Sequence, residues 1–254
     1  MDLSKVVAVI SGGASGLGAA CAKRIVSLGG SVAILDLQQE KGIELVQTIG
    51  MNNALYVKTD VTNEVSVQNA LQEVEDKYGS CNVVINCAGI AIAKKLIGRG
   101  NLHELELFQK VININVNGTL IVTKFAVDQM IRKGEILGEE RGVVINTSSV
   151  AAFDGQIGQV AYSASKGAIA SMTLPLAREL ASKQIRVMAI APGVFETPMM
   201  AGLPEKAQKS LGESVPFPSR LGKPDEYALL ACSIIENTML NGEVIRLDGA
   251  LRMS

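Results

Sequence analysis

Short apolar runs rich in β-branched residues alternate along the chain with longer segments in which apolar residues recur at helical spacing. The apolar runs predict strands, and the segments between them predict helices. The predicted strands are residues 6–10, 32–36, 54–58, 83–86, 143–147, 186–190 and 243–247. The predicted helices are residues 17–28, 40–49, 64–78, 104–132, 160–182 and 224–236. This alternation predicts an α/β fold, with a doubly wound, seven-stranded parallel sheet covered by helices on both faces.

The chain of 254 residues contains no linker, low-complexity tract or break in composition. We therefore expect one domain over residues 1–254, a length that suits a single large core. Two segments exceed what a minimal fold of this kind needs. Residues 93–106 carry Lys94, Lys95 and Arg99, and residues 132–141 are charged and contain glycine. Taken alone, both segments are expected to be solvated surface loops.

The first predicted strand leads directly into a glycine-rich turn, Ser11-Gly12-Gly13-Ala14-Ser15-Gly16-Leu17-Gly18, which opens a helix. Strand, glycine-rich turn and helix start form the context of a phosphate-binding loop. Gly12 permits the turn, Gly16 lets the backbone approach a pyrophosphate, and Gly18 allows close packing of helix on strand. The helix N-terminus offers free N–H groups and a positive dipole end. The pattern predicts a dinucleotide site in a single-domain Rossmann fold; the alternative is a tight turn without a ligand.

An acid ends the second predicted strand. Asp36 lies eighteen residues after Gly18, where a carboxylate accepts hydrogen bonds from the ribose hydroxyls and repels a 2′-phosphate. Neither residues 11–18 nor residues 37–40 contain a lysine or arginine that would accommodate such a phosphate. The sequence therefore predicts NAD rather than NADP as the cofactor. A helix-capping aspartate is the competing explanation.

Tyr162 and Lys166 lie four residues apart in a predicted helix, so their side chains project from the same face. An ammonium there favours the phenolate and is expected to lower the pKa of the phenol from about 10 toward working pH. Such a phenol takes a proton from an alcohol or returns it to an alkoxide. Ser149 precedes the tyrosine by thirteen residues. A solvated helix face is the alternative interpretation of the Tyr-x-x-x-Lys pattern taken alone.

Composition limits the classes of partner that the protein is expected to bind. The 24 Lys and Arg and 25 Asp and Glu residues give a net charge of -1, which offers no basic footprint for nucleic acid. No apolar run approaches the roughly 18 residues that span a membrane, and the first strand begins too early for an ordinary signal peptide. The four cysteines show no metal spacing and no secreted framework. We expect reduced thiols in an intracellular protein, with no metal, and His103 at the surface.

Seven motifs occur in the order typical of the short-chain dehydrogenases/reductases, and the chain resembles this family along essentially its whole length. The motifs are the glycine loop at 12–18, Asp60-Val61, Asn86-Cys87-Ala88-Gly89, Asn115, Ser149, Tyr162 with Lys166, and Pro192-Gly193. The more detailed match is to members of the family that act on 3-hydroxyacyl-CoA. It includes Ser149-Val150-Ala151-Ala152-Phe153-Asp154-Gly155-Gln156 and Pro216-Phe217-Pro218-Ser219-Arg220-Leu221-Gly222.

The resemblance implies a role for each motif residue. The catalytic residues would be Asn115, Ser149, Tyr162 and Lys166, with Asn115 holding a water that connects Lys166 to solvent. Gln156 would join Ser149 and Tyr162 in binding the substrate. The cofactor contacts would be Gly12, Ser15, Gly16, Leu17, Gly18, Asp36, Asp60, Val61, Asn86, Cys87, Ala88, Gly89, Tyr162, Lys166, Pro192, Gly193, Phe195 and Thr197.

The resemblance also implies further features of the molecule. The 93–106 insertion would help to hold the CoA part of the substrate, and residues 194–217 would cover the substrate as a lid. A homotetramer is expected, with helices 104–132 and 160–182 pairing with their symmetry mates and residues 243–254 forming a second contact. The compartment would be the cytoplasm of a bacterium or the mitochondrial matrix of a eukaryote.

Several functions compete at this point. The leading expectation is the NAD-dependent interconversion of 3-hydroxyacyl-CoA and 3-ketoacyl-CoA with short or branched acyl chains. The alternative for the same chemistry is a hydroxysteroid or another secondary alcohol. Asp36 disfavours an NADPH-dependent 3-oxoacyl carrier-protein reductase. A scaffold role is the remaining class, and the intact set of four catalytic residues argues against it as the sole role.

Overall fold

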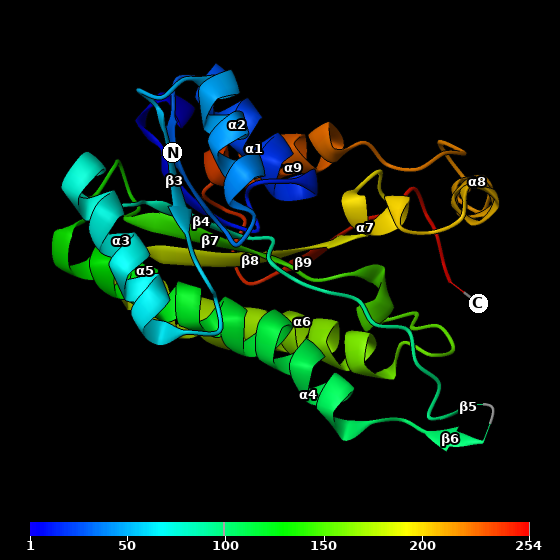
Figure 1. Cartoon of the computed structure of the whole chain (residues 1–254). Coiled ribbons are helices and arrows are strands. Elements are labelled where there is room, and N and C mark those ends of the chain that lie inside the picture. Colours follow the sequence, from blue (N-terminus) through cyan, green and yellow to red (C-terminus); the bar gives the residue numbers. More distant parts are fainter. Residues whose placement is uncertain (99, 254) are drawn as a thin grey trace.

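A seven-stranded parallel sheet forms the centre of the computed structural model, which describes residues 1–98 and 100–253 (Figure 1). The strands run in the order β3-β2-β1-β4-β7-β8-β9. Their bounds are β1 Val7–Ser11, β2 Ser31–Asp36, β3 Ala54–Lys58, β4 Val83–Asn86, β7 Gly142–Thr147, β8 Ile185–Pro192 and β9 Val244–Leu247. The α/β class and the seven parallel strands predicted from the sequence are confirmed, with strand ends displaced by no more than two residues.

Helices cover both faces of the sheet (Figure 1). On one face lie α1 Gly16–Ser27, α2 Gln39–Ile49 and α9 Pro224–Glu236; on the other lie α3 Glu64–Tyr78, α4 Leu105–Ile112, α5 Gly118–Lys133 and α6 Val160–Leu180. Successive residues of a strand point to opposite faces, so each strand feeds two cores. Ile10 packs with the α1 and α9 side, whereas its neighbour Val9 packs with α3 and α5. Two-sided burial explains why the strands are apolar throughout.

The strand order reverses at β1, which pairs with β2 on one side and β4 on the other. In a sheet of this kind the connections on the two sides of that point leave in opposite directions, which opens a crevice at the carboxyl ends of the strands. The glycine loop follows β1 directly and reaches this crevice. The fold thus brings the loop, the end of β4 and the end of β7 to one edge of the sheet.

The predicted helix over residues 104–132 is more complex than its periodicity indicates. It consists of α4, a π-helical turn over Asn113–Asn117 (η2), and α5. The Gly118 N–H donates to the Asn113 carbonyl, five residues back. Single π-helical turns of this kind are rare and occur often at functional sites. By contrast, α6 continues through Pro175, which lies inside the helix.

The segments that exceed a minimal fold lie at the periphery. A two-stranded hairpin, β5 Ile97–Gly98 and β6 Asn101–Leu102, extends from the body within the 93–106 insertion (Figure 1). Arg99 lies outside the described residues. The predicted lid contains two short helices, α7 Pro198–Ala201 and α8 Glu205–Glu213. Single turns of 3-10 helix cover Leu3–Lys5 (η1), Val150–Ala152 (η3) and Ala181–Lys183 (η4).

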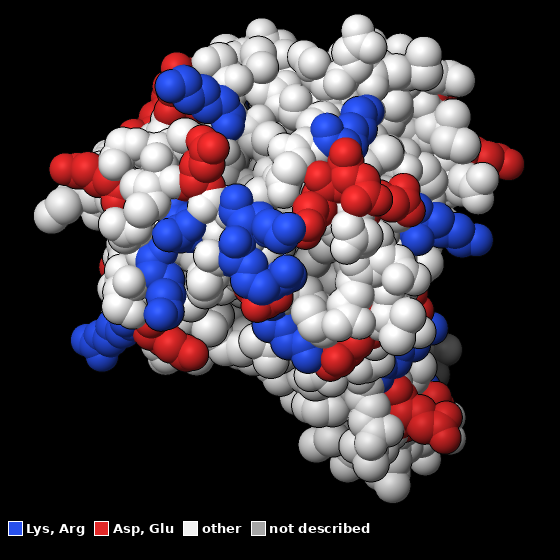
Figure 2. Space-filling view, turned by 90° about the vertical axis from the view of Figure 1, so that its left-hand side faces the viewer, with Lys and Arg blue, Asp and Glu red and all other residues white. Residues whose placement is uncertain are grey.

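Charges of both signs are interspersed on the face shown in Figure 2, where groups of Lys and Arg border groups of Asp and Glu. Among residues 1–98 and 100–253, no helix is both long and apolar enough to cross a bilayer. In the same part of the chain, no group of three or more His, Cys, Asp or Glu residues is arranged to hold a metal ion. His103 is half-buried against Phe108 rather than at the surface as expected.

Candidate active site

The glycine loop between β1 and α1 depends on its glycines. Gly12 has a φ of +64°, and a Cβ there would lie 2.6 Å from the Ala88 backbone nitrogen. Gly18 packs so closely on the loop that a Cβ would overlap the Gly12 carbonyl oxygen. Any side chain at either position would push the loop away from the end of β4. The tight turn and the close helix–strand packing predicted for these two residues are therefore both present.

The N-terminus of α1 is available to an anion. Ser15 occupies the N-cap position, yet within the described structure its side chain makes no capping hydrogen bond, and the first turn carries no acid. The first N–H groups of the helix, including that of Leu17, therefore keep their donors for a ligand. Gly16, with a φ of +53°, faces the lid, where a Cβ would lie 3.3 Å from Pro198 Cδ. These features fit a pyrophosphate.

Asp36 ends β2 beside this loop. It is buried, its Oδ2 accepts a hydrogen bond from the Ala14 N–H at 3.1 Å, and its Oδ1 accepts one from the Gln38 N–H at 3.0 Å. These bonds fix the carboxylate against the glycine loop. Each oxygen retains capacity to accept from a ribose hydroxyl. The geometry therefore fits the adenosine ribose of a dinucleotide better than it fits a simple helix cap.

The remaining residues expected at the cofactor divide into two groups. Ala88, Gly89, Pro192 and Gly193 lie at the carboxyl ends of β4 and β8, where their backbone faces the crevice; a Cβ on Gly89 would lie 3.2 Å from Asn115 Oδ1. Asp60 folds onto its own turn, with its Oδ1 accepting from the Thr62 N–H and hydroxyl. These residues can approach a ligand mainly through the main chain.

The second group turns its side chains into the fold. Asn86 is buried and donates from Nδ2 to Thr123 Oγ1 and Asn146 Oδ1. Val61 packs against Gly118, and the Phe195 ring packs against Gly222. Their side chains are thus structural, and only their backbone atoms border the crevice. Nothing in the local sequence distinguishes these two ways of contributing to a site.

Ser149, Tyr162 and Lys166 converge at the end of β7. Ser149 begins η3 immediately after the strand, while the other two lie on α6, where the Lys166 ammonium is 5.7 Å from the centre of the Tyr162 ring. Lys166 is buried, and its Nζ donates to the Thr147 carbonyl at 2.7 Å. Ser149 Oγ accepts from the Ala151 N–H at 3.1 Å, which leaves its proton free to be donated to Tyr162.

Burial opposes ionisation of both members of the Tyr–Lys pair. Desolvation raises the pKa of Tyr162 above its ordinary value, and hydrogen bonding from Ser149 counteracts this in part. Desolvation also lowers the pKa of Lys166 to about 8. In the protein alone, desolvation therefore outweighs the expected lowering of the Tyr162 pKa by Lys166.

Asn115 lies in the π-helical turn and is almost fully buried. Its Oδ1 accepts from the Ile90 N–H at 2.9 Å, and its Nδ2 donates to the Ile90 carbonyl and to Ser165 Oγ. The side chain thus ties the segment after β4 to α6, one residue from Lys166. This contact fixes the position of α6 near Lys166 relative to the segment that follows β4. Both Nδ2 protons are donated to protein groups, whereas Oδ1 and the main-chain carbonyl, which accepts from the Thr119 hydroxyl, each retain one lone pair for a water.

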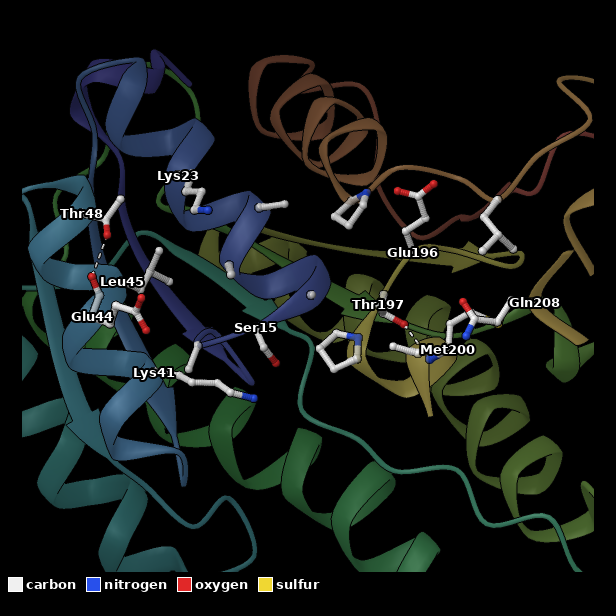
Figure 3. A pocket seen from close by; sticks show the side chains of 18 residues that line it. Ser15, Lys23, Lys41, Glu44, Leu45, Thr48, Glu196, Thr197, Met200 and Gln208 are labelled. Carbon is white, nitrogen blue, oxygen red and sulfur yellow. Dashed lines mark hydrogen bonds between the residues drawn. The ribbon is translucent and has the colours of Figure 1, made fainter. Parts of the chain in front are cut away.

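A cavity of about 810 Å³ lies beside the glycine loop (Figure 3). It is lined by Ser15 and Gly16 on one side and Thr197 and Met200 of the lid region on the other, with Lys41 directed toward it from α2. The expected cofactor residues at the loop and at the lid therefore face one another. Tyr162 does not line this cavity, which flanks the phosphate-binding loop.

A second cavity of about 470 Å³ lies between the 93–106 insertion and the segment before α6. Lys94, Lys95, Gln156 and Ser163 are among the residues that line it. Ser163 follows Tyr162 directly, so this cavity adjoins the Tyr162–Lys166 pair. The structure thus places Gln156 and the two lysines of the insertion at one site, although they are about sixty residues apart in sequence.

Two residues near Lys166 were not predicted from the sequence. Thr147 supplies the carbonyl that binds the Lys166 ammonium, and its hydroxyl contacts the Tyr227 hydroxyl of α9 at 2.8 Å. The only sequence signal for Tyr227 is a phenol at the start of the apolar run Ala228-Leu229-Leu230-Ala231. Such a group needs a buried partner. The identity of that partner depends on tertiary structure.

Comparison with known proteins agrees with this geometry. A family model described as short chain dehydrogenase matches residues 6–208. The chain is 53% identical over 250 residues to human 3-hydroxyacyl-CoA dehydrogenase type-2, covering 98% of this chain and 95% of that protein. A crystal structure of 3-hydroxyacyl-CoA dehydrogenase type-2 from Mycobacterium avium superposes with a TM-score of 0.93 at 38% identity, covering 98% and 96% of the two chains.

A third similarity concerns the cofactor. The crystal structure of 3-ketoacyl-(acyl-carrier-protein) reductase from Brucella melitensis complexed with NADH superposes with a TM-score of 0.88 at 30% identity, covering 99% of this chain and 100% of that one. The similarity extends over the glycine loop, the crevice and the residues around β7. That relative thus binds a nicotinamide dinucleotide.

Proposed function

The chain belongs to the short-chain dehydrogenases, and from this premise we propose that it interconverts 3-hydroxyacyl-CoA and 3-ketoacyl-CoA with NAD. It is an oxidoreductase of that family, which uses NAD(P). The observation that carries the proposal is the placement of Ser149, Tyr162 and Lys166 together at the crevice that the glycine loop borders. The relatives that cover almost the whole chain at about half identity supply the substrate class.

The cofactor choice rests on Asp36 and the loop. The uncapped N-terminus of α1 would bind the pyrophosphate, and the Asp36 carboxylate would accept from the ribose hydroxyls. A 2′-phosphate would lie against that carboxylate and be repelled. When bound, NAD supplies the acceptor for the hydride and a positive charge near the reacting centre. These features support NAD over NADP.

The protein's own groups handle the proton. The Ser149 hydroxyl binds the substrate oxygen, and the Tyr162 phenol exchanges a proton with it. Because burial keeps Tyr162 protonated near neutral pH, the protein alone is prepared to protonate the oxygen of a ketone during reduction. Removal of the proton from an alcohol requires a nearby positive charge, which the Lys166 ammonium provides. Lys166 would also bind the ribose next to the nicotinamide.

The second cavity supports a thioester substrate with an anionic carrier. Lys94 and Lys95 line it beside Gln156, next to the residue that follows Tyr162. Lys94 is paired with Glu104 at 3.1 Å, and its side chain remains 35% exposed. Two cations in a cavity that adjoins Tyr162 would attract the phosphates of CoA while the acyl chain reaches Tyr162. An uncharged steroid would gain nothing from these lysines.

The proposal is tested by comparing substrates and one variant. Purified protein with NADH should reduce acetoacetyl-CoA faster than a ketosteroid at equal concentration. Tyr162→Phe keeps the ring and deletes the hydroxyl, so kcat should fall at least about 10²- to 10⁴-fold. Tyr78→Phe is the matched control, because its hydroxyl is buried in α3 without a hydrogen-bond partner among the described residues. Preference for the steroid, or an active Tyr162→Phe enzyme, would contradict the proposal.

We further propose that the protein is a homotetramer and that residues 1–254 act as one dinucleotide-binding unit. The helices α4, α5 and α6 carry exposed large apolar side chains on the outer side of the sheet, among them Leu105, Leu120 and Leu174. The four cysteines are free thiols, which suits a reducing compartment.

A further inference from the structure

The last residue of β7 makes side-chain and main-chain contacts with helices on both faces of the sheet. Thr147 is the last residue of that strand. From one side, the Lys166 ammonium on α6 donates to its carbonyl at 2.7 Å; from the other, the Tyr227 hydroxyl on α9 contacts its Oγ1 at 2.8 Å. The two helices cover opposite faces (Figure 1). Thr147 is therefore held simultaneously by both layers.

Tyr227 is the largest fully buried side chain that carries a hydroxyl. Its neighbours on α9 at the same core are Ala228, Ala231, Ile234 and Ile235. A phenol among such residues costs free energy unless its hydroxyl finds a partner, and an aliphatic or phenylalanine side chain would fill the same volume without that cost. The hydroxyl therefore serves a specific contact, and Thr147 Oγ1 is the closest one.

Three groups form a closed ring around this contact. The Thr147 hydroxyl donates to Cys87 Sγ at 3.5 Å, the Cys87 thiol lies 4.0 Å from the Tyr227 oxygen, and the Tyr227 hydroxyl completes the ring to Thr147. In this arrangement each group donates once and accepts once. The two contacts to sulfur are weak. The Tyr227–Thr147 bond is thus the strong member that fixes the orientation of the Thr147 side chain.

We propose that Tyr227 is a positioning residue for the proton-transfer pair: through Thr147 it holds the carbonyl that binds the Lys166 ammonium. Ser148, the next residue, also donates from its hydroxyl to the Lys166 carbonyl at 2.9 Å, and Ser149 follows. Thr147 and Ser148 therefore both contact Lys166, and the next residue, Ser149, is the proposed substrate-binding serine. A displacement of Thr147 would move the ammonium and the substrate-binding serine together.

The groups that face this network are few. They are Tyr162 and Lys166 on α6, Cys87 after β4, Cys21 on α1 and Tyr227 itself. Burial raises the pKa values of Cys21, Cys87 and Tyr227, so all three remain neutral at working pH. Tyr227 therefore acts as a constant hydrogen-bond donor. A change in the pH profile of a Tyr227 variant would report on Tyr162 and Lys166.

The inference rests on the proposed function, because it assigns a role through Lys166 and Tyr162. Its test uses the single-turnover rate of NADH formation from 3-hydroxybutyryl-CoA over a range of pH. Tyr227→Phe should lower this rate about three- to tenfold, the effect of losing one neutral hydrogen bond. The pH of half-maximal rate should rise, because a displaced ammonium stabilises the Tyr162 phenolate less. Thr147→Val should reproduce both changes.

A double mutant separates positioning from general packing. If Tyr227 acts through Thr147, then Tyr227→Phe combined with Thr147→Val should lose no more than either variant alone. Thr147→Ser, which retains the hydroxyl, should keep more of the rate than Thr147→Val. Tyr78→Phe is the control for removal of a buried tyrosine hydroxyl and should match the wild type in rate and pH profile.

Several results would overturn the inference. They are a wild-type pH profile in Tyr227→Phe, additive losses in the double mutant, and equal rates for Thr147→Ser and Thr147→Val. The Thr147 variants test the link from its other end, so the inference stays testable even where Tyr227→Phe fails to fold. An active Tyr162→Phe enzyme would instead refute the proposed function, which keeps the two failures distinct.

Discussion

At the scale of single residues, desolvation determines how the acid–base pair behaves. Tyr162 and Lys166 occupy the same buried region, and each is shifted toward its neutral form, with the Lys166 pKa lowered to about 8. Lys166 is therefore still largely protonated at neutral pH, while Tyr162 keeps its proton. The pair carries one net positive charge. This state favours protonation of a ketone, and oxidation of an alcohol should accelerate as the pH rises.

Asp36 is the residue whose charge should decide the choice of cofactor. Asp36→Ala should weaken NAD binding and relax discrimination against NADP by about 1–3 kcal/mol, the worth of charge-assisted hydrogen bonds. The gain for NADP has a physical source, because Lys41 lies at the same cavity and would attract a 2′-phosphate that the Asp36 carboxylate no longer repels. The Lys41 Nζ donates to Gln38 Oε1 at 2.8 Å, on the exposed side of α2.

The measurement is kcat/KM with NADH and with NADPH in both proteins. Asp36→Asn is the matched variant, since it removes the charge while keeping one oxygen to accept from the Ala14 N–H or the Gln38 N–H. Asp36→Asn should gain part of the NADPH activity expected of Asp36→Ala, with less structural disturbance than the alanine variant. Equal use of NADPH and NADH by the wild type would refute the assignment.

The sequence could predict residues whose chemistry and spacing are local. Gly12, Gly18, Asp36 and the Tyr162–Lys166 pair lie where local patterns place them, because each depends on one turn, one strand end or one helix face. The partners of these residues could not be predicted. Thr147 and Tyr227 are eighty residues apart, and nothing in either segment encodes the contact between them.

At the scale of elements, the start of α9 carries a built-in dependence on pH. Glu226 accepts from the Lys223 N–H at 2.7 Å and from Arg220 through both of its carboxylate oxygens. The Arg220 guanidinium and the Lys223 N–H together hold the pKa of Glu226 at about 2. Because this lies below the ordinary value, the carboxylate stabilises the folded state above pH 4.5, and that contribution is lost as the pH falls toward 2.

Glu226→Gln tests this capping. The variant should melt at a lower temperature than the wild type at pH 7, by no more than about 4 °C, because the side chain is 41% exposed and water screens the pair. The difference should close progressively between pH 4.5 and pH 2. Glu213→Gln is the control, since its ion pair with Lys209 spans 3.9 Å and is more exposed. A gap that persists at pH 2 would contradict the prediction.

The elements that the sequence describes least well are those with conflicting local signals. The periodicity of residues 104–132 predicts one helix, and the π-helical turn at Asn113–Asn117 preserves it while displacing Asn115 inward. In that turn Asn115 is bound by Ile90 and Ser165 from outside the helix, and contacts of this kind cannot be predicted from a local pattern. The hairpin in the 93–106 insertion consists of two-residue strands, too short for any alternation to be recognised.

At the scale of the whole molecule, the outer layer of helices is left with apolar side chains that the sheet does not cover. Leu105 is 66% exposed on α4, and Leu120 is 41% exposed on α5. On α6, Leu174 is exposed, whereas Ile169 is buried inside the chain. Large apolar patches on the surface of a protein often mark an interface. The face formed by α4, α5 and α6 is therefore the proposed first interface.

The edge strand β9 and the segment that follows it form the second proposed interface. A free edge strand exposes backbone donors and acceptors, which natural proteins usually cover. Two isologous interfaces with perpendicular axes would produce a closed tetramer of D2 symmetry.

Sedimentation at micromolar concentration should then show four times the chain mass of 26.8 kDa. Leu120→Glu places a charge in the first interface and should yield dimers, whereas Val65→Glu on the exposed side of α3 should leave the tetramer intact. A wild-type protein that sediments mainly as a monomer would refute the assembly, and a wild-type dimer would remove one of its two interfaces.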